Sequence, residues 1–361
     1  TPCVQDCYLR QESDSAANLM SDAVRLVARR LRNRIARFSP KVRHFPATVL
    51  RLELSDVCPC DLPYCTTPAH RWQALSEGLP ESIDAREWAR FRDQGRIDFG
   101  RGFMGFEVVR AVVDDLRAQR MRFGTLAVRW RGEPLLHPEA EPILRHLLNV
   151  IAEGDLADRL CIETDGRFLD ERIAQLAAHP APQVWRLDAA RGGAELVARA
   201  RQALLIHRHD SVVIQTVFTV DDNFQMEDVT KIGLPIHVGR RPGSMDSVWV
   251  RRPHYDQFQT DQAAHAALEH VADSLGLAME EMELPSMLRA TGGRPSPTIS
   301  WDGKVTIRTW DHALEHVVGD VVHGLFSAAW SALVEQDSNG TDQSTWESEA
   351  YEEGLASSPS A

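Results

Sequence analysis

The sequence predicts an α/β fold built on a parallel β-sheet, either open or closed into a barrel. Three observations lead to this fold class. The 361 residues are 43% hydrophobic and 25% charged, the composition of a soluble globular protein of about two domains. Strand-like and helix-like stretches alternate between residues 49 and 238, as they do in repeated strand-helix units. Polar motifs follow several of these strands, at the edge where parallel sheets bind ligands.

Apolar periodicity gives the elements of this region in chain order. Period-two or continuous apolar runs predict strands at 49–54, 125–130, 160–163, 183–188, 211–220 and 235–238. Apolar residues at helical spacing predict helices at 85–93, 106–119, 139–153, 170–178, 194–207 and 226–231. The span from residue 66 to about residue 101 is otherwise rich in loops. These elements predict one barrel-like domain over residues 48–240.

The pattern changes after residue 240, which predicts a small second module of α+β type over residues 241–334. A helix at 261–277 comes first. Two short β-runs then flank Asp302-Gly303, the strongest signal for a two-residue β-hairpin. An amphipathic helix at 321–334 closes the folded part.

Charge is uneven along the chain. Between Arg25 and Arg43 there are eight basic residues and no acidic one, with apolar residues at helical spacing. Residues 1–47 are therefore a basic helical segment, which is either a solvated helix or a docking face for an acidic partner. Residues 335–361 carry seven acidic residues and no Lys or Arg, and we expect this tail to be disordered.

Composition also limits the partners and the location. The formal net charge of −12 argues against a protein that binds nucleic acid through its overall field. No segment approaches the roughly 18 apolar residues of a membrane helix, and Thr1–Cys3 does not open a signal segment. We expect a cytoplasmic protein that binds neither nucleic acid nor membrane.

The cysteines point to the chemistry. Three of the six, Cys58, Cys60 and Cys65, lie within eight positions directly after the first predicted strand. In a reducing compartment such a group more often binds metal than forms structural disulfides. Three thiolates could hold an iron-sulfur cluster or a zinc ion, or the trio could be incidental. Zinc is the weaker reading because its sites usually need a second cluster of ligands, and none appears.

The order of motifs resembles the radical SAM superfamily. The first strand leads into a cysteine loop that ends in Pro-Tyr-Cys65, and the next strand leads into Gly132-Glu133-Pro134. The segment from Thr164-Asp165-Gly166 to Asp170 is similar to the family's "TNG…LD" segment, and Val184–Asp188 is similar to its "V-S-L-D" strand. The Trp301-Asp302-Gly303 hairpin resembles the start of the C-terminal SPASM-like extension of peptide-maturing members.

This resemblance implies a partial (β/α)6 barrel that binds two cofactors. Cys58, Cys60 and Cys65 would hold a 4Fe-4S cluster, and the cluster's fourth iron would be chelated by the amino and carboxylate groups of S-adenosylmethionine. Gly132, Glu133 and Pro134 would meet the methionine amino group, and Thr164, Asp165 and Asp188 would lie near the methionine or ribose. The implied activity is hydrogen abstraction from a ribosomally made peptide, with an electron donor as a further partner. No residue of the sequence is assigned as the catalytic one.

The sequence departs from the family at the site itself. Leu62 stands where the middle cluster ligand is expected, and Cys60 lies two residues early. Arg131 replaces the first Gly of the usual pair, Asp165 the usual Asn, and Arg186 the usual Ser. No cysteine follows Cys161, so auxiliary clusters are not expected.

Two functions from different classes remain open. In the first, the three cysteines form a variant cluster loop and the protein is a radical enzyme. In the second, the barrel has lost catalysis and serves as a peptide-binding or scaffolding partner subunit, which Leu62, Arg131 and Arg186 favour. Separately, Arg251-Arg252 at the expected open end of the barrel could hold a carboxylate or phosphate by bidentate pairing, or be surface charge.

Overall fold

The computed structural model describes residues 49–60, 69–77, 85–95, 102–221, 224–239, 245–251, 262–277, 297–306, 313–314 and 317–330. All of them belong to one compact unit that spans Phe45–Ala361. The predicted basic helical segment, Leu62, Cys65 and the acidic tail lie outside the described residues.

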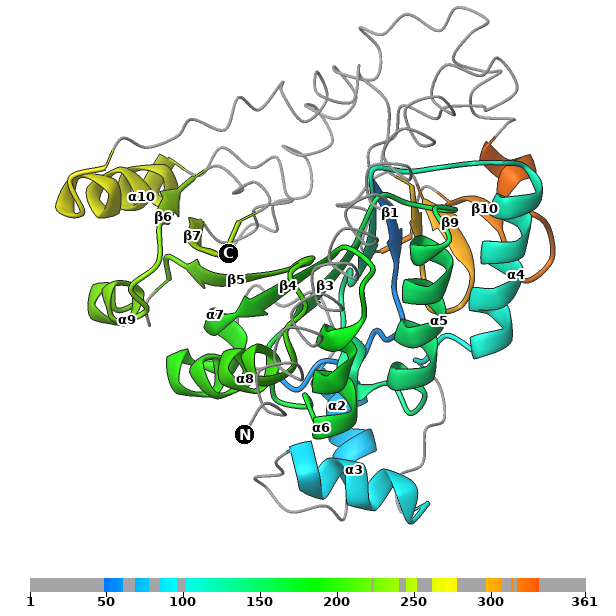
Figure 1. Ribbon diagram of the computed structural model, residues 1–361, viewed down its shortest axis with the longest axis horizontal. Coiled ribbons are helices and arrows are strands. Elements are labelled where there is room, and N and C mark those ends of the chain that lie inside the picture. The colour runs from blue at the N-terminus through cyan, green and yellow to red at the C-terminus, as the bar shows by residue number, and fades with distance from the viewer. Residues whose placement is uncertain are drawn as a thin grey trace, which may run out of the picture. The chain divides into compact units, whose positions relative to one another are not determined.

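A mixed α/β fold is built on one open sheet (Figure 1). Its strands are β1 (Val49–Leu52), β2 (Thr125–Val128), β3 (Leu160–Thr164), β4 (Gln183–Asp188), β5 (Val212–Thr219), β6 (Ile236–Val238), β7 (Ser247–Arg251), β8 (Thr298–Ile299), β9 (Lys304–Thr306) and β10 (Val317–Asp320). Their order is β10-β9-β8-β1-β2-β3-β4-β5-β7-β6. From β8 through β1 to β6 all neighbouring pairs are parallel, so the predicted fold class is confirmed.

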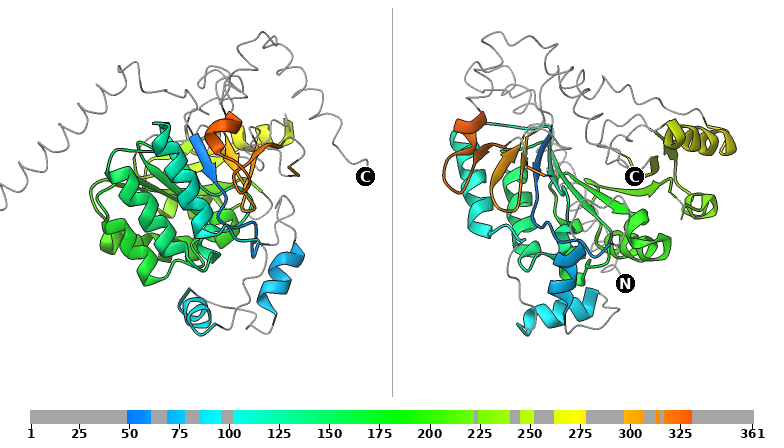
Figure 2. Two further views of the ribbon diagram at one scale, coloured as in Figure 1. Left: turned by 90° about the vertical axis from the view of Figure 1, so that its right-hand side faces the viewer. Right: turned by 180° about the vertical axis from the view of Figure 1, so that it is seen from behind.

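Helices alternate with these strands and cover one face of the sheet. The named ones are α2 (Ala69–Ser76), α3 (Ala85–Asp93), α4 (Phe106–Ala118), η1 (Pro134–Leu136), α5 (Ala140–Ala152), α6 (Glu171–Ala174), η2 (Gln175–Ala178), α7 (Ala189–Gly192), α8 (Ala194–His207), α9 (Met226–Lys231) and α10 (Gln262–Ser274). Helices α4, α5, α6 and α8 lie along the same side of β1–β4 (Figures 1 and 2). No helix among the described residues is long and apolar enough to cross a membrane.

The two faces of the sheet differ in chemistry because strand side chains alternate. The helix-covered face buries the main core, to which Leu126, Ile162 and Trp185 belong. On the other face Ala127, Cys161 and Val184 form a small apolar group, in register with Arg51 of β1. Toward the carboxyl ends this second face becomes polar. The polar face at the carboxyl edge is where the sequence motifs fall.

Two segments depart from the local expectation. Helix α2 occupies part of the span expected to be loop, and Trp72 on it packs against Trp88 of α3 with ring centroids 6.4 Å apart. The sheet also continues past residue 240, where β7 pairs with β5 and displaces β6 to the edge. Strand order is set by tertiary packing, so periodicity along the chain does not reveal it.

The predicted hairpin is present beyond this point, and it extends the sheet rather than standing apart. Strand β8 pairs parallel with β1 and antiparallel with β9, and the orange strands lie beside blue β1 in each view (Figures 1 and 2). Residues 300–303 join the two strands. Because the Ser300 amide donates to the Lys304 carbonyl at 2.9 Å, residues 301–303 form a three-residue loop instead of the expected two-residue one. Gly303, at φ +84°, takes the left-handed position after a turn closed by its own N–H on the Ser300 carbonyl. That is the three-residue hairpin form with a glycine bulge. Residues 326–330 of the predicted last helix are helical.

Candidate functional site

The cysteine loop begins where β1 ends. Ser55 forms a β-bridge with Phe103, and Ser55 Oγ accepts a hydrogen bond from the Val57 amide, so the chain turns away from the sheet. Cys58 is buried and Cys60 is half-buried. Their Sγ atoms lie 2.9 Å apart. The loop thus brings two of the three predicted metal ligands together, and Cys65 lies outside the described residues.

Gly132 allows the turn after β2 to touch this loop. A Cβ atom at Gly132 would lie 2.7 Å from both the Ser55 carbonyl carbon and the Val57 nitrogen. Real side chains do not approach backbone that closely, so only glycine fits here. The next residue completes the contact, because the Glu133 amide donates to the Val57 carbonyl at 2.8 Å. The Gly-Glu-Pro turn and the cysteine loop are therefore one packed unit.

Glu133 connects this unit to the end of β3. Its Oε1 accepts hydrogen bonds from Thr164 Oγ1 at 2.6 Å and from the Leu135 amide at 3.0 Å. Its Oε2 accepts one from the Asp165 amide at 2.9 Å. Pro134 opens η1, where its missing N–H costs nothing. Glu133, Thr164 and Asp165, chosen from separate sequence motifs, do lie in contact.

Two buried carboxyls sit side by side in this contact. Burial, and then the charge of Asp165, raises the pKa of Glu133 to about 7. Burial also raises the pKa of Asp165, and the guanidiniums of Arg167, Arg191 and Arg129 oppose the rise. Asp165 Oδ1 accepts from the Arg167 amide at 2.8 Å, whereas Oδ2 is buried with no hydrogen-bond partner in the described part of the chain. An unpaired buried acceptor of this kind needs a donor or a cation.

Asp188, at the end of β4, is enclosed by arginines. Its Oδ2 lies 3.1 Å from Arg251 Nη2, 3.3 Å from Arg129 Nη2 and 3.8 Å from Arg191 Nε. Its Oδ1 accepts from the Ala190 amide and caps α7. Burial alone would raise the pKa of Asp188, but the guanidiniums outweigh burial and hold the pKa below its usual value. The carboxylate stays ionised as the anchor of these arginines.

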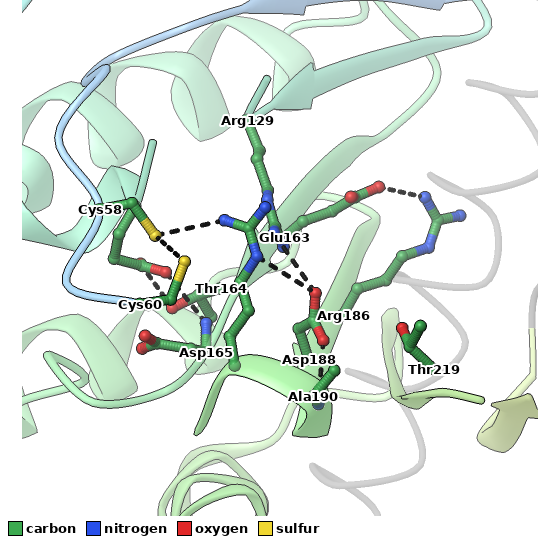
Figure 3. A network of polar contacts seen from close by, with 12 residues as sticks. Cys58, Cys60, Arg129, Glu163, Thr164, Asp165, Arg186, Asp188, Ala190 and Thr219 are labelled. Atoms are coloured by element: carbon green, nitrogen blue, oxygen red, sulfur yellow. Dashed lines mark hydrogen bonds and ion pairs between the residues drawn. The ribbon is translucent and has the colours of Figure 1, made fainter. Parts of the chain in front are cut away.

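Arg191 links Asp188 to the cysteine loop. Asp188, Cys58 and Cys60 belong to one network of polar contacts (Figure 3). Its Nη1 lies 3.4 Å from both Cys58 Sγ and the Arg131 carbonyl oxygen. A guanidinium next to a thiol favours the thiolate, the form that binds metal.

Arg131 and Arg186 stand where radical SAM sequences have small residues. Their side chains do not fill the space between the cysteine loop, Glu133 and Asp188. Arg131 turns back to β1, where it forms a bidentate pair with buried Glu53 at 2.8 and 2.7 Å. Arg186 lies on the polar face of the sheet, where it pairs with Glu163 at 2.7 Å and with Gln215 at 3.0 Å. Both side chains are held by specific partners, so the sequence departures at residues 131 and 186 leave the Glu133–Asp165 contact intact.

Sequence reasoning missed most of the arginines. Arg129 directly follows β2, Arg191 lies on α7 and Arg251 ends β7, so the three are far apart in the chain. Only Arg251 carried a signal, as half of an Arg-Arg pair near the open end of the sheet. Among the described residues, no group of three or more Cys, His, Asp or Glu is arranged to hold a metal ion, and Cys65 is not one of those residues.

Comparisons with known proteins give structural similarities at low identity. The structure of BtrN in complex with AdoMet and 2-DOIA is 14% identical, with 78% of this chain and 81% of that chain covered and a TM-score of 0.38. Native anSMEcpe with bound AdoMet is 12% identical, with 78% and 80% covered and a TM-score of 0.49. Streptococcus suis SuiB bound to precursor peptide SuiA is 10% identical, with 78% and 64% covered and a TM-score of 0.47.

No protein-family model matches the chain. No curated protein matches it either. The function proposed below therefore rests on the residues of this chain.

Proposed function

We propose that this protein is a radical SAM-like enzyme that binds a 4Fe-4S cluster and S-adenosylmethionine and modifies a ribosomally made peptide by hydrogen abstraction. One observation carries the proposal. The cysteine loop, the Gly132-Glu133-Pro134 turn and the Thr164-Asp165 segment are joined by direct contacts at the carboxyl edge of one parallel sheet. Parallel sheets bind their ligands at this edge.

The residues around Glu133 suit the amino group of S-adenosylmethionine. Asp165 Oδ2 is a buried acceptor with no partner in the described part of the chain, and Glu133 lies in contact with the same residue. An iron-bound amino group still carries N–H donors, and one of them would satisfy this acceptor. In the proposal Glu133 and Asp165 orient the methionine end, and Thr164 fixes Glu133.

The cysteines suit a cluster by their chemistry, and the thiolate-favouring Arg191 supports this. When bound, the cluster and S-adenosylmethionine together would supply the hydrogen-abstracting radical. The 2.9 Å between Cys58 and Cys60 Sγ is shorter than the roughly 3.8 Å between two thiolates on one tetrahedral metal with metal–sulfur bonds of about 2.3 Å. In a 4Fe-4S cluster each cysteine would bind a different iron, so the two thiolates would lie farther apart still. Cluster binding would therefore move the two thiols apart, and half-buried Cys60 is the one with room to turn.

The same short contact favours the competing proposal. If the thiols remain together, Cys58 and Cys60 hold no cluster, and the protein is a peptide-binding or scaffolding partner subunit of the same fold. Such a subunit would use the polar edge of the sheet for binding alone.

Anaerobic reconstitution with iron and sulfide separates the two proposals. The enzyme proposal expects about four irons per chain and a broad brown charge-transfer absorbance. Cys60→Ala should lose the cluster, whereas Cys161→Ala should keep it, because Cys161 is buried in the small apolar group at the other end of β3. A colourless wild-type protein without iron would overturn the enzyme proposal, and a stable complex with another protein would then support the scaffold.

A further inference from the structure

Arg129 and Arg251 share one buried carboxylate, that of Asp188. Three guanidiniums converge on one carboxylate oxygen, at 3.1 to 3.8 Å. These groups are largely removed from water, since the side chains of Arg129, Arg251 and Asp188 are 6%, 17% and 3% exposed. Arg186 and Glu163 on the neighbouring strands neutralise each other. Among the described residues, Arg129 and Arg251 form their ion pairs with Asp188 alone.

The nearby acids do not remove this imbalance. The carboxyls of Glu133 and Asp165, which lie near the cysteine loop, also attract the Arg129 guanidinium. Burial raises the pKa of both carboxyls, so together they carry less than two negative charges near neutral pH. Buried charge without a counter-charge is costly, and an anionic ligand is the direct way to balance it.

Arg129 and Arg251 have N–H groups that donate to no residue in the described part of the chain. Arg251 donates from Nη2 to Asp188 and from Nε to Thr219 Oγ1 at 3.4 Å, which leaves the N–H groups of Nη1 for another acceptor. Among the described residues, the only side-chain hydrogen bond that Arg129 donates runs from its Nη2 to Asp188. In the described part of the chain, neither arginine has a nitrogen that is both buried and unpaired, so these donors stay accessible. Asp188 fixes both guanidiniums in place.

The side chain of Trp249, on β7, packs beside these donors. Its ring centroid lies 5.4 Å from the Arg251 guanidinium carbon and 6.0 Å from that of Arg186. The indole is fixed, because its Nε1 donates to the Gly239 carbonyl at 3.1 Å. Arg186 and Thr219, the partner of Arg251, lie on the opposite side of Asp188 from Cys58 and Cys60 (Figure 3). A ligand bound here would enter the polar face away from the cysteine loop.

We propose that Arg251, supported by Arg129 and Trp249, binds a carboxylate of the substrate. The inference rests on the proposed function and on the family resemblance, which implies that the cofactor's own carboxylate would be held by the cluster iron. A second carboxylate receptor on the far side of Asp188 then serves the other reactant. Guanidiniums bind carboxylates in bidentate fashion, with charge-assisted hydrogen bonds that an amide cannot match.

Two short peptides that differ in one group test this directly. The probes are acetyl-Gly-Glu-Gly-amide and acetyl-Gly-Gln-Gly-amide, titrated into the reconstituted protein with and without S-adenosylmethionine and followed by ligand-observed NMR. We expect the Glu peptide to bind about tenfold more tightly than the Gln peptide, the size of one retained charge-assisted contact. Arg251→Gln should abolish the preference, and Arg251→Lys should retain part of it.

Controls make each outcome decisive. Arg145→Gln removes an exposed arginine of α5, which is 51% exposed, and should leave the preference unchanged. Equal binding of both peptides to the wild-type protein overturns the inference. So does weaker binding of S-adenosylmethionine by Arg251→Gln, because the receptor would then serve the cofactor. If S-adenosylmethionine does not bind at all, the proposed function fails separately, and the peptide preference without cofactor still tests Arg251.

Discussion

The buried Glu133–Asp165 pair makes stability depend on pH in a way that one substitution should reveal. Glu133 has a pKa raised from 4.5 to about 7, through burial first and the Asp165 charge second. In the unfolded chain the pKa returns to its ordinary value. Between about pH 4.5 and about pH 7 the folded protein therefore binds more protons than the unfolded chain, and stability falls as pH rises. At roughly 1.4 kcal/mol per pKa unit, the loss is about 3 kcal/mol.

The wild-type profile alone would hide this loss. Burial lowers the pKa of His137 from 6.5 to about 4, and the hydrogen bond with the Met104 carbonyl only partly opposes the shift. Between about pH 4 and about pH 6.5 the unfolded chain binds the extra proton, so stability rises with pH. The two groups act with opposite sign over overlapping windows, and a variant comparison is needed.

Asp165→Asn is the suitable variant, because Asn Oδ1 can still accept the Arg167 amide hydrogen bond. The substitution removes one of two buried carboxyls and the charge that raises the Glu133 pKa, while His137 is unchanged. Relative to wild type, we expect the unfolding free energy of the cofactor-free variant to rise by at least about 1 kcal/mol between about pH 5 and about pH 8. Urea unfolding at each pH measures it, with Asp114→Asn on the exposed face of α4 as the charge-loss control. A difference from wild type that does not change with pH would refute the reasoning.

Further predictions concern the packing of the site. Gly132→Ala forces a Cβ to within 2.7 Å of the Val57 nitrogen and should cost about 1–3 kcal/mol of stability. In the control variant Gly105→Ala the new Cβ meets nothing nearer than 3.9 Å, so the loss should be smaller. Thermal unfolding compares the two variants, and equal losses would contradict the close contact at Gly132. Arg131→Met leaves buried Glu53 without its bidentate partner and should cost about 3–5 kcal/mol in urea unfolding. A loss under about 1 kcal/mol would show that the pair is not structural.

Much of the fold follows from local sequence. Helices 85–93, 194–207 and 226–231 and strand 183–188 have the predicted bounds, because apolar periodicity and the turns that flank them are local signals. Other features depend on contacts between distant segments. The insertion of β7 between β5 and β6 is one of these, and the hairpin loop follows from the left-handed position of Gly303.

The candidate site was predictable to the same extent. Glu133, Thr164 and Asp165 could be grouped because each follows a parallel strand, and their contacts confirm that they meet, while their role toward a cofactor stays a prediction. The arginines around Asp188 could not be grouped, since they converge from the end of β2, from α7 and from β7. The spacing of these arginines along the chain does not indicate that they converge.

Reductive cleavage of S-adenosylmethionine tests the central claim most directly. The reconstituted protein is reduced anaerobically with S-adenosylmethionine, and 5′-deoxyadenosine and methionine are measured by liquid chromatography. The radical-enzyme account predicts both products from wild type and from Cys161→Ala, and neither from Cys60→Ala. A wild-type protein that carries about four irons and binds S-adenosylmethionine, yet forms no 5′-deoxyadenosine under reduction, would contradict the account.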